Sequence, residues 1–410
     1  MLKRIDVEHL KLGMHLHELC GSWMSHPFWR KSFILEDLKD IERILDSGIK
    51  EAWIDSEKGL DVEFGQTKEE AEREIDRELN RAAQSSVAVH EHVALPQEVE
   101  RAARICARSR DAVVSMFREA RMGKAIEAKD AMPLVDEISS SMLRNPGALI
   151  SIARLKRADD YTYMHSVAVC GLMIALAQRL EFDERDTRDA GLAGLLHDVG
   201  KMTIPPEVLN KPGKLTDAEF TLVKTHPEAG HKMLLEGSDI AEAALDVCLH
   251  HHEKIDKKGY PHRLQGGEIS LFAKMAAICD VYDAITSDRP YKAGWNPAEA
   301  IRRMAEWSKS HFEDHVFQAF VKSVGIYPVG TLVRLQSARL GVIIDQSDQS
   351  LLTPQVKVFY AIKSRKRLTP EIIDLASPGC GEKILAHESP QKWGFPDLEQ
   401  LWRGGGPRPW

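Results

Sequence analysis

The chain has 410 residues, of which 43% are hydrophobic and 29% charged, a composition typical of a globular protein with two or three domains. Its formal net charge of −7 argues against general nucleic-acid binding, which needs a basic surface. The apolar run at 167–180 is too short and interrupted to span a membrane, and the charged N-terminal residues do not form a signal peptide. The six cysteines include no C-x-x-C pair, so we expect reduced thiols in a cytoplasmic protein.

The first part of the chain mixes strand and helix patterns. Alternating apolar residues predict short strands at 14–19 and 51–55, and helical spacing predicts a helix at 34–45. The polar stretch 66–99 carries a run of charges, which is typical of a solvated helical face or a linker. We therefore expect residues 1–130 to form a small α+β domain of unknown or regulatory role, with a helical linker.

The middle of the chain, 131–325, has an almost wholly helical pattern. Strongly apolar helices are predicted at 164–180 and 270–285. Thr216 is followed three residues later by Glu219, which is a capping box and marks the start of another helix. We expect this part to be a helical bundle domain.

The pattern changes again after residue 325. Strand-like, β-branched segments follow at 330–335, 341–345 and 356–362, and we expect residues 326–410 to be a β-rich extension. Its Gly- and Pro-rich end, 404–410, is predicted to be disordered. The predicted fold class is thus mainly α: a helical bundle with a smaller α+β N-terminal domain and a short β-rich C-terminal extension.

Metal-competent side chains recur through the helical domain. They are His165, the pair His197 and Asp198, His226, the run His250, His251 and His252, and Asp280. A lone helical histidine is more often structural than a ligand, but helices of one bundle can project such groups into a shared core. Imidazoles and carboxylates without cysteine favour Fe or Mn, leave Zn, Ni and Co open, and argue against a structural zinc site.

The number of ligands suits two ions if Asp198 bridges them. One ion would take Asp198 with His165, His197 and Asp280, and the other would take Asp198 with His226, His251 and His252. Each octahedral ion would then keep places for a bridging water and a substrate oxygen, which is the arrangement for hydrolysing a phosphodiester. Lys201, Arg289 and Lys292 flank this set and would neutralise phosphate oxygens. For Lys201 and Lys292, a solvated surface position without contact to the phosphate is an equally good interpretation.

The order of these motifs resembles a known family. His197-Asp198 resembles the HD superfamily of metal-dependent phosphohydrolases, and Gly259-Tyr260-Pro261, eight residues after His251, resembles its HD-GYP branch. The stretches 196–205, 209–215, 226–230 and 280–291 match the same branch in the same order.

The resemblance implies hydrolysis of cyclic di-GMP to pGpG, to GMP, or to both, by a dinuclear metal site that activates a bridging water. The implied cofactors are two divalent ions per chain, Fe or Mn, with Ni, Co, Zn and Mg as alternatives. Asp198 and Lys201 would be catalytic, and Lys201, Tyr260, Arg289 and Lys292 would contact the substrate. The implied metal ligands are His165, His197, Asp198, His226, His251, His252 and Asp280.

Two positions depart from the family pattern. Some members carry a glutamate for a third ion four residues before the first histidine, where this chain has Tyr161, so we predict a dinuclear site. Lys257 and Lys258 precede the Gly-Tyr-Pro motif in place of small residues, and we expect them to be solvated. His250 is expected to lie outside the ligand set, and Glu253 to orient neighbouring groups.

Residues 1–130 resemble a domain of unknown function often fused in front of HD-GYP domains, through Leu12-Gly13-Met14 and His26-Pro27-Phe28. This domain would offer a surface for protein partners such as signalling proteins. For the chain as a whole we expect no nucleic-acid binding and no membrane insertion, and oligomerisation stays open. Two alternatives to the phosphodiesterase remain: a non-catalytic cyclic di-GMP receptor or adaptor, and an HD hydrolase of another nucleotide, such as (p)ppGpp or a dNTP.

Overall fold

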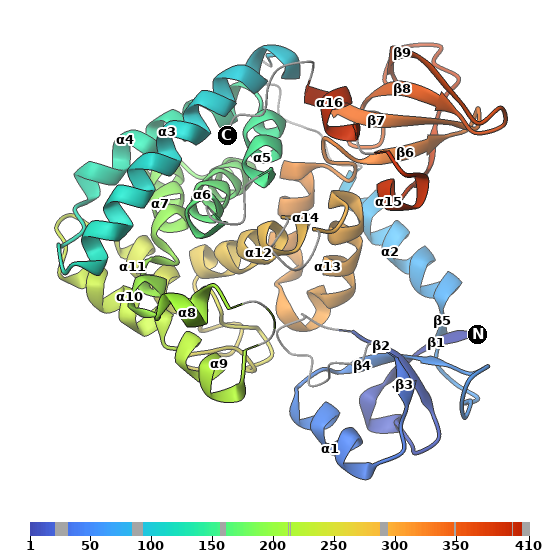
Figure 1. The fold of residues 1–410 in the computed structure, drawn as a ribbon, viewed down its shortest axis with the longest axis horizontal. Coiled ribbons are helices and arrows are strands. Elements are labelled where there is room, and N and C mark those ends of the chain that lie inside the picture. Colours follow the sequence, from blue (N-terminus) through green and yellow to red (C-terminus); the bar gives the residue numbers. More distant parts are fainter. Residues whose placement is uncertain are drawn as a thin grey trace. The chain divides into compact units, whose positions relative to one another are not determined.

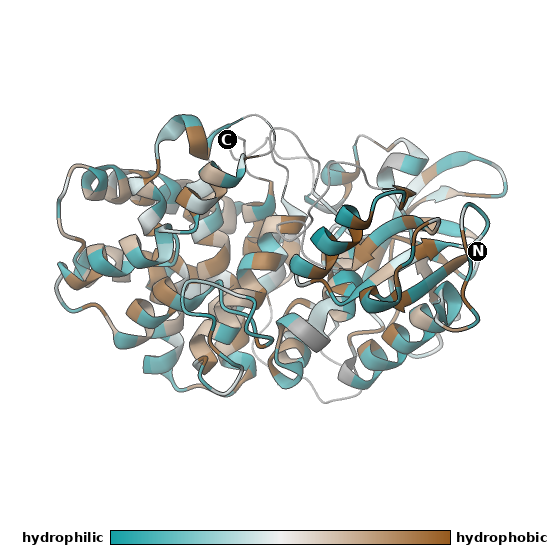
Figure 2. Cartoon of the chain, turned by 90° about the horizontal axis from the view of Figure 1, so that it is seen from below, coloured by the Kyte–Doolittle hydropathy of each residue, from teal (hydrophilic) through white to brown (hydrophobic). Residues whose placement is uncertain are grey.

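The computed structural model describes residues 1–20, 32–83, 93–155, 161–211, 213, 215–287, 294–347, 350–395 and 397–403. The chain divides into two compact units, a smaller one of Met1–Arg81 with Arg302–His311 and a larger one of Ala82–Ile301 with Phe312–Trp410. Among the described residues, every helix is too short or too polar to cross a membrane. Figure 2 shows both hydrophilic and hydrophobic residues along the helices of the chain.

The smaller unit is built on an antiparallel sheet of strand order β3-β2-β4-β1-β5. Its buried core includes Leu16, Ile44 and Ile54. The long helix that follows the sheet buries residues four apart, Ala71, Ile75 and Leu79, as an amphipathic helix does. The elements are β1 (Leu2–Asp6), β2 (His15–Cys20), β3 (Phe33–Ile34), α1 (Leu38–Asp46), β4 (Glu51–Asp55), β5 (Gln66–Thr67) and α2 (Lys68–Ala83).

The larger unit contains the helical bundle (Figure 1). The apolar helix α6 runs through it and is almost fully buried from Met164 to Ala177. The helices before and including α6 are α3 (Leu95–Arg121), α4 (Ala128–Arg144), α5 (Pro146–Arg154) and α6 (Tyr161–Arg179). After it come α7 (Glu184–Leu196), the 3-10 helix η4 (Val199–Thr203), α8 (Pro206–Leu209), α9 (Asp217–Val223), α10 (His226–Leu235), α11 (Glu242–His250), α12 (Leu271–Thr286), α13 (Pro297–His311), which continues into the smaller unit, and α14 (Asp314–Val324).

Two glycines allow the close helix approaches that bring the metal-competent residues together. A Cβ on Gly194 of α7 would lie 2.9 Å from the Val169 carbonyl oxygen of α6, so α7 packs directly against the α6 backbone. A Cβ on Gly200 of η4 would lie 1.9 Å from the carbonyl oxygen of His226, so η4 touches the start of α10. Larger residues would force these elements apart.

The C-terminal part of the larger unit is an antiparallel sheet of order β10-β6-β7-β8-β9. Its core includes Val333, Leu335, Ile343, Val356 and Val358. Its elements are β6 (Leu332–Leu335), β7 (Arg339–Asp345), β8 (Gln355–Ala361), β9 (Lys366–Asp374), β10 (Ile384–His387), α15 (Pro390–Trp393) and α16 (Leu398–Arg403).

The predicted fold class is confirmed: a mainly helical protein with small sheets in its N- and C-terminal parts. The capping box of Thr216 and Glu219 is present at the start of α9. The helix predicted from residue 34 begins at Leu38, because Ile34 pairs with His15 in the sheet and Asp37 accepts the first helical N–H. Residues 26–28 and 404–410, for which predictions were made, lie outside the described residues.

Candidate metal centre

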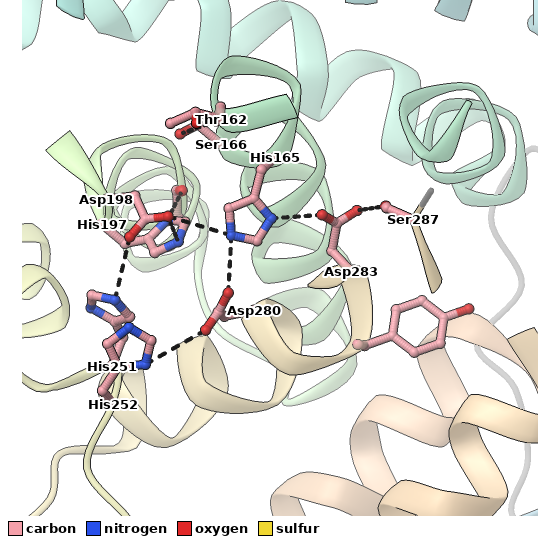
Figure 3. A network of polar contacts seen from close by, with 12 residues as sticks. Thr162, His165, Ser166, His197, Asp198, His251, His252, Asp280, Asp283 and Ser287 are labelled. Atoms are coloured by element: carbon pink, nitrogen blue, oxygen red, sulfur yellow. Dashed lines mark hydrogen bonds and ion pairs between the residues drawn. The ribbon is translucent and has the colours of Figure 1, made fainter. Parts of the chain in front are cut away.

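The ends of several helices converge on one buried cluster (Figure 3). It unites the seven predicted metal ligands in two groups: Asp198, His226, His251 and His252 in one, and His165, His197 and Asp280 in the other, with the candidate ligand atoms of each group within 4.8 Å of one another. His165 and Asp280 come from within α6 and α12, and the others stand at helix ends. The assignment of these residues as ligands stays a prediction, but their spatial convergence is what that prediction requires.

A helix end explains how adjacent histidines share the cluster. Neighbouring residues on a helix point about 100° apart, so two consecutive ligands need an interruption. The helix α11 ends at His250, His251 is its C-cap, and His252 lies beyond it. The rings of His251 and His252 have centroids 4.1 Å apart and are tilted by 44°, so both face the cluster.

Asp198 occupies the centre of the cluster, between η4 and the end of α7. Its Oδ2 lies 3.5 Å from Nε2 of His165 and 3.4 Å from Nε2 of His197. Its Oδ1 lies 3.3 Å from Nε2 of His226 and 3.7 Å from Nε2 of His251. The two oxygens of one carboxylate therefore face different sets of imidazoles, which is the geometry of a bridging ligand.

Asp280 closes the other side of the cluster. Its Oδ1 lies 2.9 Å from Nε2 of His165, and its Oδ2 lies 3.8 Å from Nδ1 of His252. Like Asp198, it is buried. The cluster thus contains two carboxylates, each close to imidazole nitrogens.

Most of the imidazoles are held by hydrogen bonds on the ring nitrogen that faces away from the cluster. A backbone carbonyl can only accept, so Nδ1 must carry the hydrogen and Nε2 the lone pair in a neutral ring. The Nδ1 atoms of His197, His226 and His251 lie 2.8, 2.7 and 3.0 Å from the carbonyl oxygens of Gly194, Val223 and Val247. These rings present the tautomer that binds a cation.

The interior of the cluster fits a cation. Among the described residues, Nε2 of His197 and Oδ1 of Asp198 are buried and have no hydrogen-bond partner. Buried polar atoms in native proteins nearly always have a hydrogen-bond partner. A nitrogen lone pair and a carboxylate oxygen are both acceptors, so they need a proton or a positive ion between them. The donor set of imidazole nitrogens and carboxylate oxygens suits Fe, Mn, Zn, Ni or Co.

The protonation states of three cluster residues, Asp198, His226 and His252, also suit a metal site. Burial opposes ionisation of Asp198, but the Lys201 ammonium and the imidazole of His197 outweigh it and hold the pKa of Asp198 well below its usual range. Burial lowers the pKa of His226 to about 4 against the opposing effect of Asp198. Burial and the neighbouring His251 keep the pKa of His252 well below its usual range. Ionised carboxylates and neutral imidazoles are the ligand forms that metals bind.

The predicted substrate residues Lys201 and Tyr260 lie at the edge of the cluster. The Lys201 ammonium contacts Oδ2 of Asp198, and its side chain is 20% exposed. The Tyr260 ring packs on His252, with centroids 4.7 Å apart. Burial, assisted by the charges of Asp280 and Asp198, raises the pKa of Tyr260 well above its usual range, so the phenol is neutral. Arg289 and Lys292 lie outside the described residues.

Two residues next to the predicted ligands have other partners. His250 has its Nδ1 2.7 Å from Asp246 and its Nε2 3.1 Å from Nδ1 of His262. Glu253 accepts hydrogen bonds from the backbone N–H groups of three successive residues, His262, Arg263 and Leu264. Glu253 therefore holds the segment that follows Gly259-Tyr260-Pro261. Lys257 and Lys258 are exposed, as expected.

Sequence reasoning assigned no role to Asp283, whose Oδ2 lies 2.6 Å from Nδ1 of His165. Ser287 donates a hydrogen bond to its other oxygen, at 3.2 Å. Asp283 follows Asp280 by three residues on α12 and shares its face, and this spacing was the available signal.

The chain matches known proteins over both of its main parts. Residues 2–131 match the model of a domain of unknown function, DUF3391, and residues 145–316 match an HD domain. A cyclic di-GMP phosphodiesterase of Pseudomonas aeruginosa is 54% identical, covering 98% of this chain and 96% of the relative. A cyclic di-GMP phosphodiesterase response regulator of Xanthomonas campestris is 40% identical over 37% of this chain and 41% of its own length. A 3′3′-cGAMP-specific phosphodiesterase of Vibrio cholerae is 34% identical over 40% of this chain and 38% of its own length.

Proposed function

Because the chain belongs to the HD-GYP family of phosphodiesterases and carries a DUF3391 domain in front of its HD domain, we propose that it hydrolyses cyclic di-GMP to pGpG, to GMP, or to both. The observation that carries this proposal is the position of Asp198, whose two oxygens face separate sets of imidazoles. The relative that shares nearly the whole length of the chain is named for this activity.

The seven clustered residues would hold two divalent ions, Fe or Mn, with Ni, Co, Zn and Mg as alternatives. One set is Asp198 Oδ2, His165, His197 and Asp280, and the other is Asp198 Oδ1, His226, His251 and His252. Ions held there would lower the pKa of a water molecule and neutralise phosphate charge. The outward hydrogen bonds on Nδ1 fix the rings in advance, so their orientation need not change during the reaction.

The residues at the edge of the cluster would act on the phosphate. Lys201 is a cation beside Asp198 with part of its side chain open to solvent, and we assign it to the charge that develops on the leaving oxygen. The neutral Tyr260 ring, packed on His252, would form a wall of the substrate pocket. Arg289 and Lys292 would supply further positive charge to the substrate phosphates. The DUF3391 domain would supply the surface for protein partners.

The test is a paired measurement on one anaerobic preparation of the full chain. Metal content per chain is determined, and cyclic di-GMP hydrolysis is followed by nucleotide chromatography, with 3′3′-cGAMP as a parallel substrate. We expect about two ions per chain and the appearance of pGpG or GMP. A third ion would contradict the dinuclear site predicted from Tyr161. Metal-loaded protein that binds cyclic di-GMP without cleaving it would instead support a receptor, and exclusive cleavage of 3′3′-cGAMP would change the substrate.

A further inference from the structure

A cavity lies in the larger unit, with a volume of about 170 Å³. It is a partly open pocket bordered by α5, by the ends of α4, α6 and α14, by α12, and by the end of β7 and the segment after it. Its lining includes none of the seven predicted metal ligands, all of which the structure describes. The cavity is therefore separate from the candidate metal centre, although Tyr282 in its lining belongs to the same helix as Asp280.

The lining of this cavity is positively charged. Arg154, Arg179 and Lys322 contribute cations, and Asp345 is the acidic lining residue within the described part of the chain. The oxygens of Asp345 already accept hydrogen bonds from the backbone N–H groups of Leu95 and Gln346 and from the side-chain amide of Asn145, at 3.1, 3.0 and 3.3 Å. The positive charge of the lining thus exceeds its negative charge, which favours an anionic occupant.

Within the part of the chain that the structure describes, two buried polar atoms of the lining lack a hydrogen-bond partner: Oη of Tyr282 and Oε1 of Gln346. Tyr282 is 1% exposed. A tyrosine hydroxyl carries a hydrogen at neutral pH, so it has a hydrogen bond to donate. A guanidinium can only donate, so Arg154 beside this hydroxyl cannot accept that hydrogen. Among the described residues, the Tyr282 hydroxyl thus has no acceptor for its hydrogen, and a ligand in the cavity could supply one.

The rest of the lining is largely apolar, with Ile150, Ala175, Val329 and Leu351 among its residues. A cavity of roughly 150 Å³ is sufficient for a benzene ring. We propose that this cavity binds a small organic carboxylate whose apolar body is about the size of one ring. The carboxylate would accept hydrogen bonds from the cationic side chains and from the Tyr282 hydroxyl, since two acceptor oxygens match the donors of a guanidinium.

The test uses the metal-loaded full chain and benzoate as the probe, with binding followed by ligand-observed NMR titration and by the shift in melting temperature. Benzamide has nearly the same shape without the charge, and inorganic phosphate has the charge without the apolar body. We expect saturable binding of benzoate, with benzamide at least about tenfold weaker because charge-assisted hydrogen bonds are lost. Equal affinity for benzamide, binding of phosphate alone, or no saturable binding of benzoate would overturn the proposal.

Variants locate the bound probe. Arg179→Met and Lys322→Met remove one cation each while keeping most of the side-chain volume, and each should weaken benzoate binding at least about fivefold. Arg185→Met is the matched control, because Arg185 is 88% exposed on α7 and does not line the cavity. If one cavity variant fails to fold, as judged by its melting curve, benzoate binding by the other variant tests the cavity site. Benzoate binding that survives these changes and disappears on metal removal would place the probe at the metal centre and reject the cavity site.

Discussion

The Nδ1 atom of His165 lies 2.6 Å from Oδ2 of Asp283, and Nε2 of the same ring lies 2.9 Å from Oδ1 of Asp280. Both carboxylates come from α12, one helical turn apart. Burial opposes the charge of His165, but its hydrogen bonds with Asp280 and Asp283 outweigh burial and raise its pKa. One helix thus supplies a predicted ligand on one side of the ring and an orienting carboxylate on the other.

Replacing Asp283 should weaken metal binding without removing a predicted ligand. Asp283→Asn keeps the size of the side chain but loses the charge that orients the His165 ring and raises its basicity. We expect metal affinity to fall by roughly 10- to 100-fold, measured as metal content after dialysis against a competing chelator. Asp111→Asn, at an Asp that is 74% exposed on α3, is the control. Wild-type metal retention in Asp283→Asn would show that the contact has no role at the centre.

Replacing Lys201 should separate turnover from metal binding. Its ammonium contacts Asp198 but offers no lone pair to an ion. Lys201→Met should lower kcat for cyclic di-GMP by roughly 10²- to 10³-fold, as losing a donor to a developing oxyanion does, with metal content unchanged. Lys232→Met, at an exposed lysine on α10, should behave as wild type. If Lys201→Met lost its metals as Asp198→Ala is expected to, the lysine would be structural rather than catalytic.

The residues that lie together in the cluster could be selected from the sequence because metal binding restricts the residue types. Only a few side chains bind a metal, so His197-Asp198 and the histidine run before Gly259 stand out against a helical background. Two consecutive ligands require either a helix end or a distorted helix, and α11 ends at His250. The orienting role of Asp283 did not stand out, because a carboxylate that bonds a ligand looks like any other carboxylate in a sequence.

The parts that the sequence did not predict depend on tertiary contacts. The strand β9 has mostly exposed residues and lacks a regular inside–outside alternation, so periodicity could not reveal it; its pairing with β8 defines it. Ile34 has helical spacing with the residues after it, but pairing with His15 holds it in the sheet. The partners of Glu253 likewise come from a loop whose path no local pattern predicts.

Replacing Glu253 should affect substrate binding rather than metal content. Its Oε1 accepts from the N–H groups of His262 and Arg263, and its Oε2 accepts from that of Leu264. In Glu253→Gln one acceptor oxygen is replaced by an amide NH₂, which is a donor and cannot accept from a backbone N–H. The loss of that hydrogen bond should destabilise the loop conformation by about 1–3 kcal/mol. Because this loop follows Tyr260, we expect KM for cyclic di-GMP to rise while the metals remain bound.

Two control variants show whether the effect of Glu253→Gln is specific to its contacts with the loop. Glu236→Gln changes an exposed glutamate at the end of α10 and should leave KM unchanged. His250→Ala should keep its metals, since the His250 ring is bonded to Asp246 and His262. A loss of metal in Glu253→Gln would show that Glu253 acts on the cluster itself, and an unchanged KM would show that the loop does not shape the substrate pocket.

The largest stability effect outside the site is expected at Glu98 on α3, whose side chain is completely buried. It accepts hydrogen bonds from Nε and Nη2 of Arg144 at 2.9 and 2.8 Å and from the Ser141 hydroxyl at 2.9 Å. It thereby joins α3 to the end of α4. Removing one partner of such a pair leaves the other charge poorly solvated, which costs more than the pair itself contributes.

Glu98→Ala should therefore lower the free energy of unfolding by about 3–5 kcal/mol, whereas Ser141→Ala, which leaves the ion pair intact, should lower it by about 1 kcal/mol. Urea unfolding followed by circular dichroism measures both, with Glu100→Ala, at an exposed position of the same helix, as the control that should lie within about 0.5 kcal/mol of wild type. If Glu98→Ala matched Glu100→Ala, the Glu98–Arg144 pair would contribute nothing to the packing of α3 on α4. An equal loss in Ser141→Ala and Glu98→Ala would assign the stabilisation to the hydroxyl rather than to the charge pair.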